Sequence, residues 1–373
     1  MSWMFYRPDA VAVWREPVVR ERLSWYYAVM RDVAPAKFHI AARVEAPVDY
    51  AMFEDRELWK LHDELSRAAD VEWRTQREKP DLSILKKALP PASLLDIKIE
   101  LAKRQLKRCY LCERRCGVDR TERAGACLLD KNARVASFFH HLGEEAPLVP
   151  SGTIFFSGCN FRCVYCQNWD ISQHPEAGVE VTAEALAVVQ IRLRHEGARN
   201  INWVGGEPTP NIPTILESLK ILATRGVNVP QLWNSNMYLT PEALSLILHV
   251  IDIWLPDFKY GSNTCALKYS VAPRYWEVTT RNFITICKRG EDIIVRHLVL
   301  PGHVECCTKP VLKWLSENCR HALVNIMDQY RPEYLVNKLE KYKELRRRVT
   351  KRELETAYSL ADQFGLAWRE VTK

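Results

Sequence analysis

Three cysteines lie close together near the middle of the sequence, at Cys159, Cys163 and Cys166. Their spacing is C-x3-C-x2-C, within the segment SGCNFRCVYCQNWDIS. Three thiolates on one loop can bind three irons of a [4Fe–4S] cluster, which usually takes four cysteine ligands. The remaining iron can be chelated by a small molecule, and the amino and carboxylate groups of a methionine moiety suit that role. The alternative interpretations are a zinc loop or three thiols in a core.

A glycine-rich segment, Gly205-Gly206-Glu207-Pro208, follows the three cysteines at the end of the next predicted strand. Glycines let a ligand approach the backbone closely where a side chain would clash. Alone, the segment is equally typical of a turn. Its position after the cysteine loop indicates a binding segment.

This combination resembles the radical S-adenosylmethionine (SAM) superfamily. The resemblance implies a [4Fe–4S] cluster that reduces SAM to methionine and a 5′-deoxyadenosyl radical, which abstracts hydrogen from a substrate. More specifically, the sequence looks like uncharacterised radical SAM proteins described as homologues of pyruvate formate-lyase activating enzyme. Besides the two segments above, the motifs that carry this resemblance are FFHHLGEEAPLVPSG, WNSNMY, LPDFKYG, VRHLVLPGH and NIMDQYRP. It covers roughly residues 105–335 and implies no particular substrate.

The resemblance also assigns cofactor contacts to residues at the expected strand ends. The residues concerned are Tyr165, Gly205, Gly206, Glu207, Asn234, Asn236, Asp257, Lys259 and His297. By this resemblance Tyr165 lies against adenine, whereas Asp257 and Lys259 reach the ribose or carboxylate of SAM. Helix caps and surface ion pairs are the ordinary alternatives for such residues. For His297 the alternative is a hydrogen-bonded core histidine in an apolar strand.

A second set of cysteines lies upstream, with the spacing C-x2-C-x3-C-x10-C. Its members are Cys109, Cys112, Cys116 and Cys127. Four thiolates in one short segment suit a structural Zn²⁺ and a second [4Fe–4S] cluster equally well. Four free thiols are the alternative, although unligated thiols at this density would oxidise readily.

Other residues with metal-binding side chains give weaker signals. The segment HHLGEE carries His140, His141, Glu144 and Glu145, which suit a metal site or a contact between the cysteine module and the sheet. The remaining cysteines are Cys265, Cys287, Cys306, Cys307 and Cys319. None of them forms a C-x-x-C pair, so we expect ordinary thiols. A third cluster would require Cys306, Cys307 and Cys319 to converge with another ligand.

The elements that must position these residues are short apolar runs alternating with helical stretches. The predicted strands are residues 153–158, 200–204, 229–234, 250–257, 292–300 and 322–327, and helices are expected at 183–194 and 212–224. Strands separated by helices predict an α/β fold with a parallel sheet whose chemistry lies at the carboxyl ends of the strands. Six such units favour a partial (β/α)6 TIM-like barrel.

The domain boundaries follow from changes in this pattern. Residues 1–93 read as a mainly helical N-terminal extension of unknown role, with a helix at 50–69 and a polar connector at 72–81. Residues 94–150 combine a helix at 94–106 with the cysteine-rich module. Residues 151–332 form the predicted barrel, and residues 333–373 form terminal helices that cover its edge.

The composition limits the class of protein. The chain has 373 residues, of which 47% are hydrophobic and 27% charged, which excludes a disordered chain. It has no signal-peptide core and no long apolar run, so we expect a cytoplasmic protein without membrane insertion. In that compartment twelve cysteines indicate metal ligands or reactive thiols rather than disulfides. The net charge of +7 comes from scattered basic residues, which indicate a solvated surface. A nucleic-acid partner is the alternative.

The expected partners follow from the resemblance. A one-electron donor of the flavodoxin or ferredoxin type must reduce the cluster. A protein is one substrate class, by analogy with activating enzymes, and a small molecule, lipid or RNA is the alternative, with the Trp-rich N-terminal region or the basic tail as a docking surface. A non-enzymatic iron–sulfur protein for electron transfer or scaffolding is a further alternative, which the GGEP and DFK segments argue against.

Overall fold

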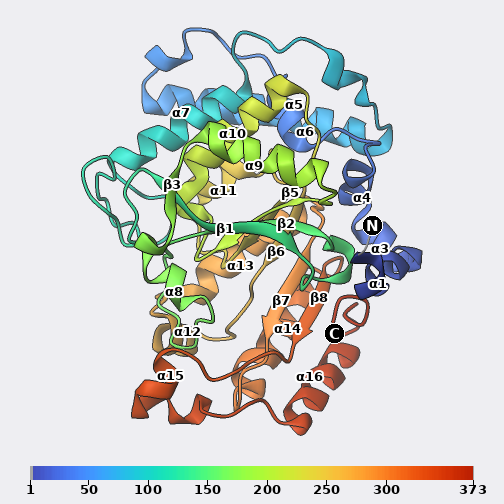
Figure 1. Ribbon diagram of the computed structural model, residues 1–373, viewed down its shortest axis with the longest axis vertical. Coiled ribbons are helices and arrows are strands. Elements are labelled where there is room, and N and C mark those ends of the chain that lie inside the picture. Colours follow the sequence, from blue (N-terminus) through green and yellow to red (C-terminus); the bar gives the residue numbers. More distant parts are fainter. Residues whose placement is uncertain (1–2, 373) are drawn as a thin grey trace.

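The computed structural model describes residues 3–372, in which helices surround a mainly parallel sheet (Figure 1). The N-terminal helices are α1 (Trp3–Tyr6), α2 (Asp9–Ala12), α3 (Pro17–Arg22), α4 (Ser24–Met30), α5 (Lys37–Ala41), α6 (Asp55–Glu78) and α7 (Leu94–Lys107). The helices that alternate with strands are α8 (Trp169–Ser172), α9 (Ala183–His195), α10 (Ile212–Arg225), α11 (Pro241–Ile247), α12 (Asn263–Ser270), α13 (Tyr275–Lys288) and α14 (Lys309–Asn318). Two more, α15 (Leu335–Lys338) and α16 (Lys351–Gln363), follow the last strand.

Six strands run parallel to one another, and each follows the previous one in chain order. They are β2 (Ser151–Phe156), β4 (Ile201–Gly205), β5 (Gln231–Ser235), β6 (Ile253–Pro256), β7 (Ile294–Leu298) and β8 (Leu323–Met327). The ladders form a six-stranded sheet in the order β3-β1-β2-β4-β5-β6 and a separate pair β7-β8. Isolated parallel bridges, Trp254–Ile293 and Asp257–Arg296, connect β6 to the β7 segment. All six carboxyl ends therefore lie on the same side.

The predicted strands are confirmed, because each of the six overlaps one of these parallel strands. The expected helices at 183–194, 212–224 and 94–106 correspond to α9, α10 and α7. Two strands were not predicted, namely β1 (Ala133–His141) and β3 (Val179–Val181). β1 pairs antiparallel with both β2 and β3 and extends the sheet beyond β2.

The polar connector predicted at residues 72–81 is wrong for most of its length, because α6 continues to Glu78. A capping box between Glu54 and Glu57 fixes the start of this helix. Trp73 and Gln76 are buried on the same side as the earlier apolar residues, and no helix breaker precedes Pro80. Burial of this helix face therefore keeps the segment helical, although most of its residues are polar.

The N-terminal helices pack against the amino-terminal side of the parallel strands. One core cluster contains Val13, Trp14, Val19, Leu23 and Tyr26 together with Leu232, Ile253, Ile294 and Leu323. Buried carboxylates reinforce this contact, since Asp252 accepts hydrogen bonds from Trp25 Nε1 and the Lys37 amide, both at 2.9 Å. Trp14 is buried in this cluster, and Trp25 and Trp73 are buried in the larger core cluster. These three tryptophans are therefore structural, whereas Trp3 and Trp59 are half-buried.

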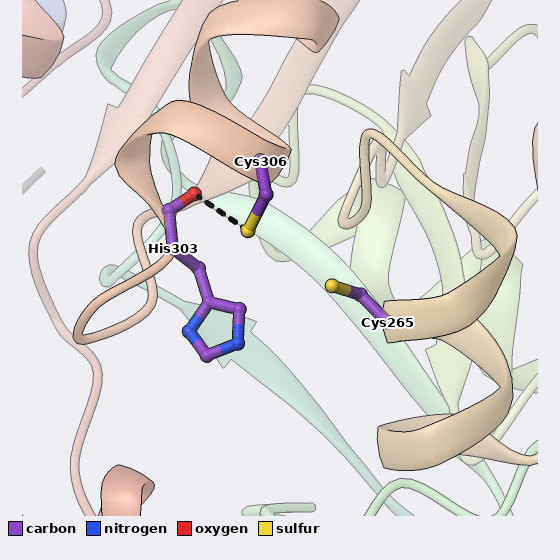
Figure 2. A group of neighbouring side chains, drawn as sticks. All are labelled: Cys265, His303 and Cys306. Carbon is purple, nitrogen blue, oxygen red and sulfur yellow. Dashed lines mark hydrogen bonds between the residues drawn. The ribbon is translucent and has the colours of Figure 1, made fainter.

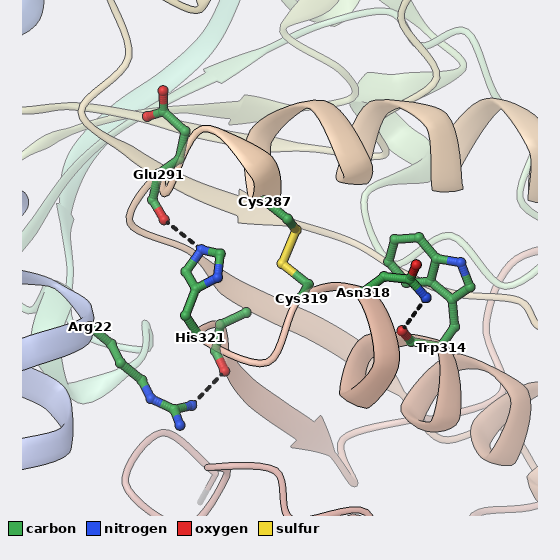
Figure 3. Close-up of a disulfide and its surroundings, with 8 residues drawn as sticks. Arg22, Cys287, Glu291, Trp314, Asn318, Cys319 and His321 are labelled. Atoms are coloured by element: carbon green, nitrogen blue, oxygen red, sulfur yellow. Dashed lines mark hydrogen bonds between the residues drawn. A yellow bond between two sulfur atoms is a disulfide. The ribbon is translucent and has the colours of Figure 1, made fainter.

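The structure contains one disulfide among the described residues, between Cys287 and Cys319 (Figure 3). This corrects the expectation that the remaining cysteines are ordinary thiols. Cys287 lies at the end of α13 and Cys319 directly follows α14, and the two Cα atoms are 5.3 Å apart. The packing of the two helix ends, which lie 32 residues apart in sequence, creates a pair that spacing alone does not indicate.

The C-terminal segment lies along the free edge of β8. After α16 the chain forms a parallel bridge between Ala367 and Leu323. In the basic stretch before α16, Arg346 pairs with Glu340 and Arg347 with Glu353, both at 2.8 Å, as on a solvated surface. No helix in the described part of the chain is long and apolar enough to cross a membrane.

Candidate active site at the strand ends

A cavity of about 220 Å³ lies at the carboxyl ends of the parallel strands. The cysteine loop after β2 forms one side, and the segments that end β4, β5, β6, β7 and β8 form the rest. The predicted site residues that line it are Cys159, Cys163, Tyr165, Cys166, Gly205, Gly206, Glu207, Asn234, Asn236, Asp257 and Lys259. Strand ends that are far apart in sequence therefore meet around one space.

Each cysteine of the loop receives a polar contact at its sulfur. The backbone N–H of Phe161 donates to Cys159 Sγ at 3.3 Å. Hydroxyl groups lie beside the other two sulfurs, with Ser270 Oγ 3.0 Å from Cys163 Sγ and Ser172 Oγ 3.3 Å from Cys166 Sγ. Burial raises the pKa of all three thiols, that of Cys163 to about 11. A bound cation is therefore needed to hold them as thiolates at neutral pH.

The sulfur atoms of the cysteine loop are not gathered into one compact group. Among the described residues, the cysteines of the loop do not form a group of three whose sulfurs all lie within 4.8 Å of one another. A tetrahedral zinc ion with Zn–S bonds of about 2.3 Å requires neighbouring sulfurs about 3.8 Å apart. The loop is therefore not arranged as a preformed single-zinc site, and the C-x3-C-x2-C spacing is what favours an iron–sulfur cluster.

The glycine pair is required by the packing of the chain itself. Gly205 has a φ of +118°, and a Cβ there would overlap the backbone of Phe156 in β2. A Cβ on Gly206 would overlap the carbonyl of Gly158. The expected reason for the glycines was close approach of a ligand. The structure adds that they let the end of β4 lie directly against the start of the cysteine loop.

Glu207 uses its carboxylate to join the ends of β4 and β5. Its Oε1 accepts hydrogen bonds from Thr209 Oγ1 and Ser235 Oγ, both at 2.6 Å, and its Oε2 accepts one from the Asn236 amide at 3.0 Å. Burial raises the pKa of this carboxyl, while these donors lower it. The geometry makes Glu207 a positioning residue for the cavity wall.

At the end of β6, Asp257 and Lys259 form an ion pair at the cavity, with Lys259 Nζ 2.5 Å from Asp257 Oδ2. Burial alone would lower the pKa of Lys259, but the Asp257 carboxylate raises it above its usual value. The pair therefore presents both a cationic and an anionic group to a ligand. Tyr165, which also lines the cavity, is held by Tyr260, with 2.5 Å between the two hydroxyl oxygens.

His297 does not line the cavity. Its Nδ1–H donates to the Phe258 carbonyl at 2.7 Å, and Nε2 is 2.9 Å from Thr308 Oγ1. Burial lowers the pKa of this histidine to about 4, which keeps the ring neutral. The structure therefore places it in the core, contrary to the expected cofactor contact.

The adjacent residue, Arg296, does line the cavity and was not among the predicted contacts. Its Nε donates to Glu145 Oε1 at 2.7 Å, and its Nη2 contacts Glu144. Burial alone would raise the pKa of Glu144, but Arg296 and His141 lower it to about 2. An arginine in an apolar strand was the available signal, because a buried guanidinium requires acidic partners.

The HHLGEE segment therefore serves packing rather than metal binding. His141 Nδ1 is 3.1 Å from Glu144 Oε1, whereas His140 pairs with Glu196. Glu144 and Glu145 are buried beneath the cavity and bind Arg296. Of the two interpretations of this segment, the contact with the sheet agrees with the structure.

The second cysteine set lies directly beside the cysteine loop. The Cys127 carbonyl accepts a hydrogen bond from the Cys159 amide at 3.1 Å. Arg114 Nε donates to the Asn160 carbonyl at 2.7 Å, and the Asn160 side chain also contacts the Cys112 thiol. In the described part of the chain, no three of these four sulfurs lie within 4.8 Å of one another.

Comparisons with known proteins agree with this geometry. Residues 153–315 match the family model of the radical SAM superfamily. An uncharacterised protein of Methanocaldococcus jannaschii, MJ0674, is 41% identical over 351 residues, which is 92% of this chain and 98% of that protein. The chain belongs to the radical SAM superfamily. It is therefore a radical SAM enzyme, and membership implies a [4Fe–4S] cluster, SAM and a reductant.

The match to MJ0674 leaves out at most a small part of the chain, so it extends to most of the N-terminal helices. A second uncharacterised protein of the same organism, MJ0808, is 34% identical over 121 residues, or 27% of this radical SAM chain and 35% of that protein.

Two solved structures are distantly similar. A domain of pyruvate-formate lyase-activating enzyme from Bacteroides vulgatus has a TM-score of 0.38 at 15% identity and covers 47% of this chain and 98% of that chain. SuiB from Streptococcus suis, bound to the precursor peptide SuiA, has a TM-score of 0.42 at 11% identity, with 58% and 46% covered. Neither similarity assigns a substrate to this radical SAM enzyme.

Proposed function

We propose that Cys159, Cys163 and Cys166 hold a [4Fe–4S] cluster on which SAM binds within the strand-end cavity. The observation that carries this proposal is the meeting of the three thiols with polar residues from four strand ends around one space. One-electron reduction of SAM at the cluster supplies the 5′-deoxyadenosyl radical that abstracts hydrogen from a substrate. The side chains of this chain bind, orient and enclose the cofactor.

In this proposal each group at the cavity has a separate role. The Asn234 side chain is buried, and its Nδ2 has no hydrogen-bond partner among the described residues. It offers a donor to an oxygen of SAM. The paired Asp257 and Lys259 offer groups of both charges, and Tyr165 offers a ring for adenine. Ser270, Ser172 and the Phe161 amide donate to the cysteine sulfurs and stabilise their negative charge.

The six parallel strands would form a partial (β/α)6 barrel within residues 151–332. The parallel bridges between β6 and the β7 segment support this, since they make the strand order continuous. Residues 1–93 would be an integral helical layer, residues 94–150 the helix and metal module, and residues 333–373 the segment along the β8 edge. The packing of Tyr26 and Trp25 against the strands favours such a layer.

Cys109, Cys112, Cys116 and Cys127 would hold a second metal centre, either a [4Fe–4S] cluster or zinc. Four cysteines within one short segment support a metal site of either kind. The hydrogen bond from the Cys159 amide to the Cys127 carbonyl places the module next to the first loop. A flavodoxin- or ferredoxin-type donor would supply the electron, and a protein substrate is retained from the activating-enzyme resemblance, with a small molecule, lipid or RNA as the alternative.

The direct test is SAM cleavage by the anaerobically reconstituted full chain with dithionite. We expect 5′-deoxyadenosine from the wild type and a loss of about 100-fold or more in Cys163→Ala, because three thiolates are needed to hold the cluster. A matched control is the Cys287→Ser/Cys319→Ser double variant, whose cysteines lie away from the cavity and should retain cleavage. No 5′-deoxyadenosine above the Cys163→Ala level in the wild type would refute the proposal.

A further inference from the structure

A third group of metal-binding side chains lies outside the cavity. Cys265, His303 and Cys306 bring one ligand atom each into a group in which all three lie within 4.8 Å of one another (Figure 2). In the described part of the chain this is the one such group of histidine, cysteine and acidic side chains. The sequence predicted ordinary thiols here and indicated that a third cluster would require Cys306, Cys307 and Cys319 to converge. Cys319 is instead bound to Cys287.

Two loops from neighbouring strands create this group. Cys265 lies in the first turn of α12 after β6, and Cys306 lies in the π-helix η7 (Val304–Thr308) after β7. Gly261 permits the two segments to touch, since a Cβ there would lie 2.7 Å from the Cys306 carbonyl and 2.9 Å from that of Cys307. The positions of the thiols are thus fixed by close backbone packing.

The histidine is oriented as a metal ligand. Its Nδ1–H donates to the Pro301 carbonyl at 2.7 Å, so Nε2 carries the lone pair in the neutral ring. Tyr269 Oη lies 3.0 Å from this Nε2 and 2.8 Å from Glu344 Oε1. Tyr269 can keep its bond to Glu344 when Nε2 binds a cation.

A fourth donor, Cys307, is adjacent to the group of three but lies outside it. The buried Cys307 has its Sγ 4.0 Å from that of Cys306, and the Cys265 thiol contacts both. This S–S distance is close to the roughly 3.8 Å expected between ligands of one tetrahedral zinc ion. Neither predicted cysteine set contains such a compact group of three in the described part of the chain. All three thiols are free, whereas Cys287 and Cys319 are bonded.

We propose that Cys265, His303, Cys306 and Cys307 form a site for a zinc-class divalent cation, separate from both predicted cluster sites. Three thiolates and one imidazole in tetrahedral arrangement are a recognised structural zinc set. The ion would join the loops after β6 and β7 beside the cavity. Ser270 lies five residues after Cys265 in α12, which is about 7.5 Å further along the helix axis. Its hydroxyl contacts Cys163 in the cysteine loop. A bound ion would therefore fix the position of α12, and with it the contact from Ser270 to the cysteine loop.

The test is the metal content of full-length protein purified without oxygen in zinc-containing medium. We expect the wild type to hold about one zinc more per chain than Cys265→Ser and His303→Gln, because each substitution removes one of four ligands. The matched control is Cys163→Ala, which should lose iron and keep the zinc of the wild type. The two substitutions lie on different loops, so one still tests the site if the other prevents folding. The melting temperature of each variant shows whether it folds.

Cobalt provides a second measurement that counts thiolates. Co²⁺ added in place of zinc should give sulfur-to-cobalt charge-transfer absorption, lowered by about a third in Cys307→Ser because one of three thiolates is lost. Equal zinc and equal cobalt spectra in folded wild type and Cys265→Ser would overturn the proposal. So would a disulfide joining Cys265 to Cys306 or Cys307 in protein kept free of oxygen.

Discussion

Asn234 and Asn236 lie two residues apart at the end of β5, yet their amides have different surroundings. Asn236 Nδ2 donates to Asn160 Oδ1 at 2.7 Å, and its Oδ1 accepts from the Tyr238 amide at 3.0 Å. Asn234 Nδ2 is buried at the cavity without a partner among the described residues. A buried donor without a partner is costly, so at the residue scale we expect Asn234 to face an acceptor atom of the ligand.

This difference predicts separable effects of two alanine substitutions. Asn234→Ala should raise the KM for SAM at least tenfold without lowering stability, since a hydrogen bond to a charged ligand contributes about 1.5 to 3 kcal/mol. Asn236→Ala should instead lower the free energy of unfolding, because it leaves the Tyr238 amide unpaired. Steady-state kinetics and urea unfolding of both variants measure this. An unchanged KM in Asn234→Ala would show that the amide does not face SAM.

At the scale of elements, β7 shows how strand periodicity separates two polar neighbours. Successive side chains of a strand point to opposite faces. Arg296 therefore faces the cavity and the buried pair Glu144 and Glu145, while His297 faces Phe258 and Thr308. The arginine fixes the connection between β1 and β2 against β7. Its loss would leave two carboxylates without their cation.

We expect Arg296→Met to lower the free energy of unfolding by about 3 to 5 kcal/mol, the usual effect of breaking a buried ion pair. The substitution keeps the apolar stem and removes the charge. Arg192→Met is the matched control, because the Arg192–Glu196 pair is exposed and its loss should leave stability unchanged. Equal urea midpoints for both variants would contradict the interpretation that Arg296 stabilises this connection.

Helices and strands were predictable where a local sequence pattern determines them. The six parallel strands are short apolar runs buried on both faces, so their positions follow from composition. β1 was missed because Phe138 and Phe139 are both exposed, which breaks the alternation of a half-buried strand. The cysteine loop was predictable from local spacing, whereas Cys265 and His303 are brought together by tertiary packing. No local pattern indicates such convergence.

At the scale of the whole molecule, the N-terminal helices pack against the strands through an interface that contains both apolar and polar contacts. The buried Lys37 pairs with Glu291, and the Tyr26 amide donates to Asp292 Oδ2 at 2.8 Å. On the same helix as Lys37, His39 Nε2–H donates to the Val227 carbonyl at 3.0 Å, after α10. These contacts make the N-terminal region a structural layer whose stability is coupled to that of the sheet.

His39 therefore makes this interface sensitive to acid. Burial lowers its pKa from 6.5 to about 3, with the nearby Arg43 acting in the same direction. The unfolded chain binds the proton first, so the stability from neutral His39 is complete above pH 6.5 and is lost as pH falls. Between pH 7 and pH 5 this loss is about 2 kcal/mol. His39→Gln keeps a donor for the Val227 carbonyl. Its free energy of unfolding should fall by about 2 kcal/mol less than that of the wild type between pH 7 and pH 5. Urea unfolding of both proteins at both pH values measures this difference. Parallel losses in the two proteins would mean that His39 takes up its proton as readily in the folded chain as in the unfolded chain.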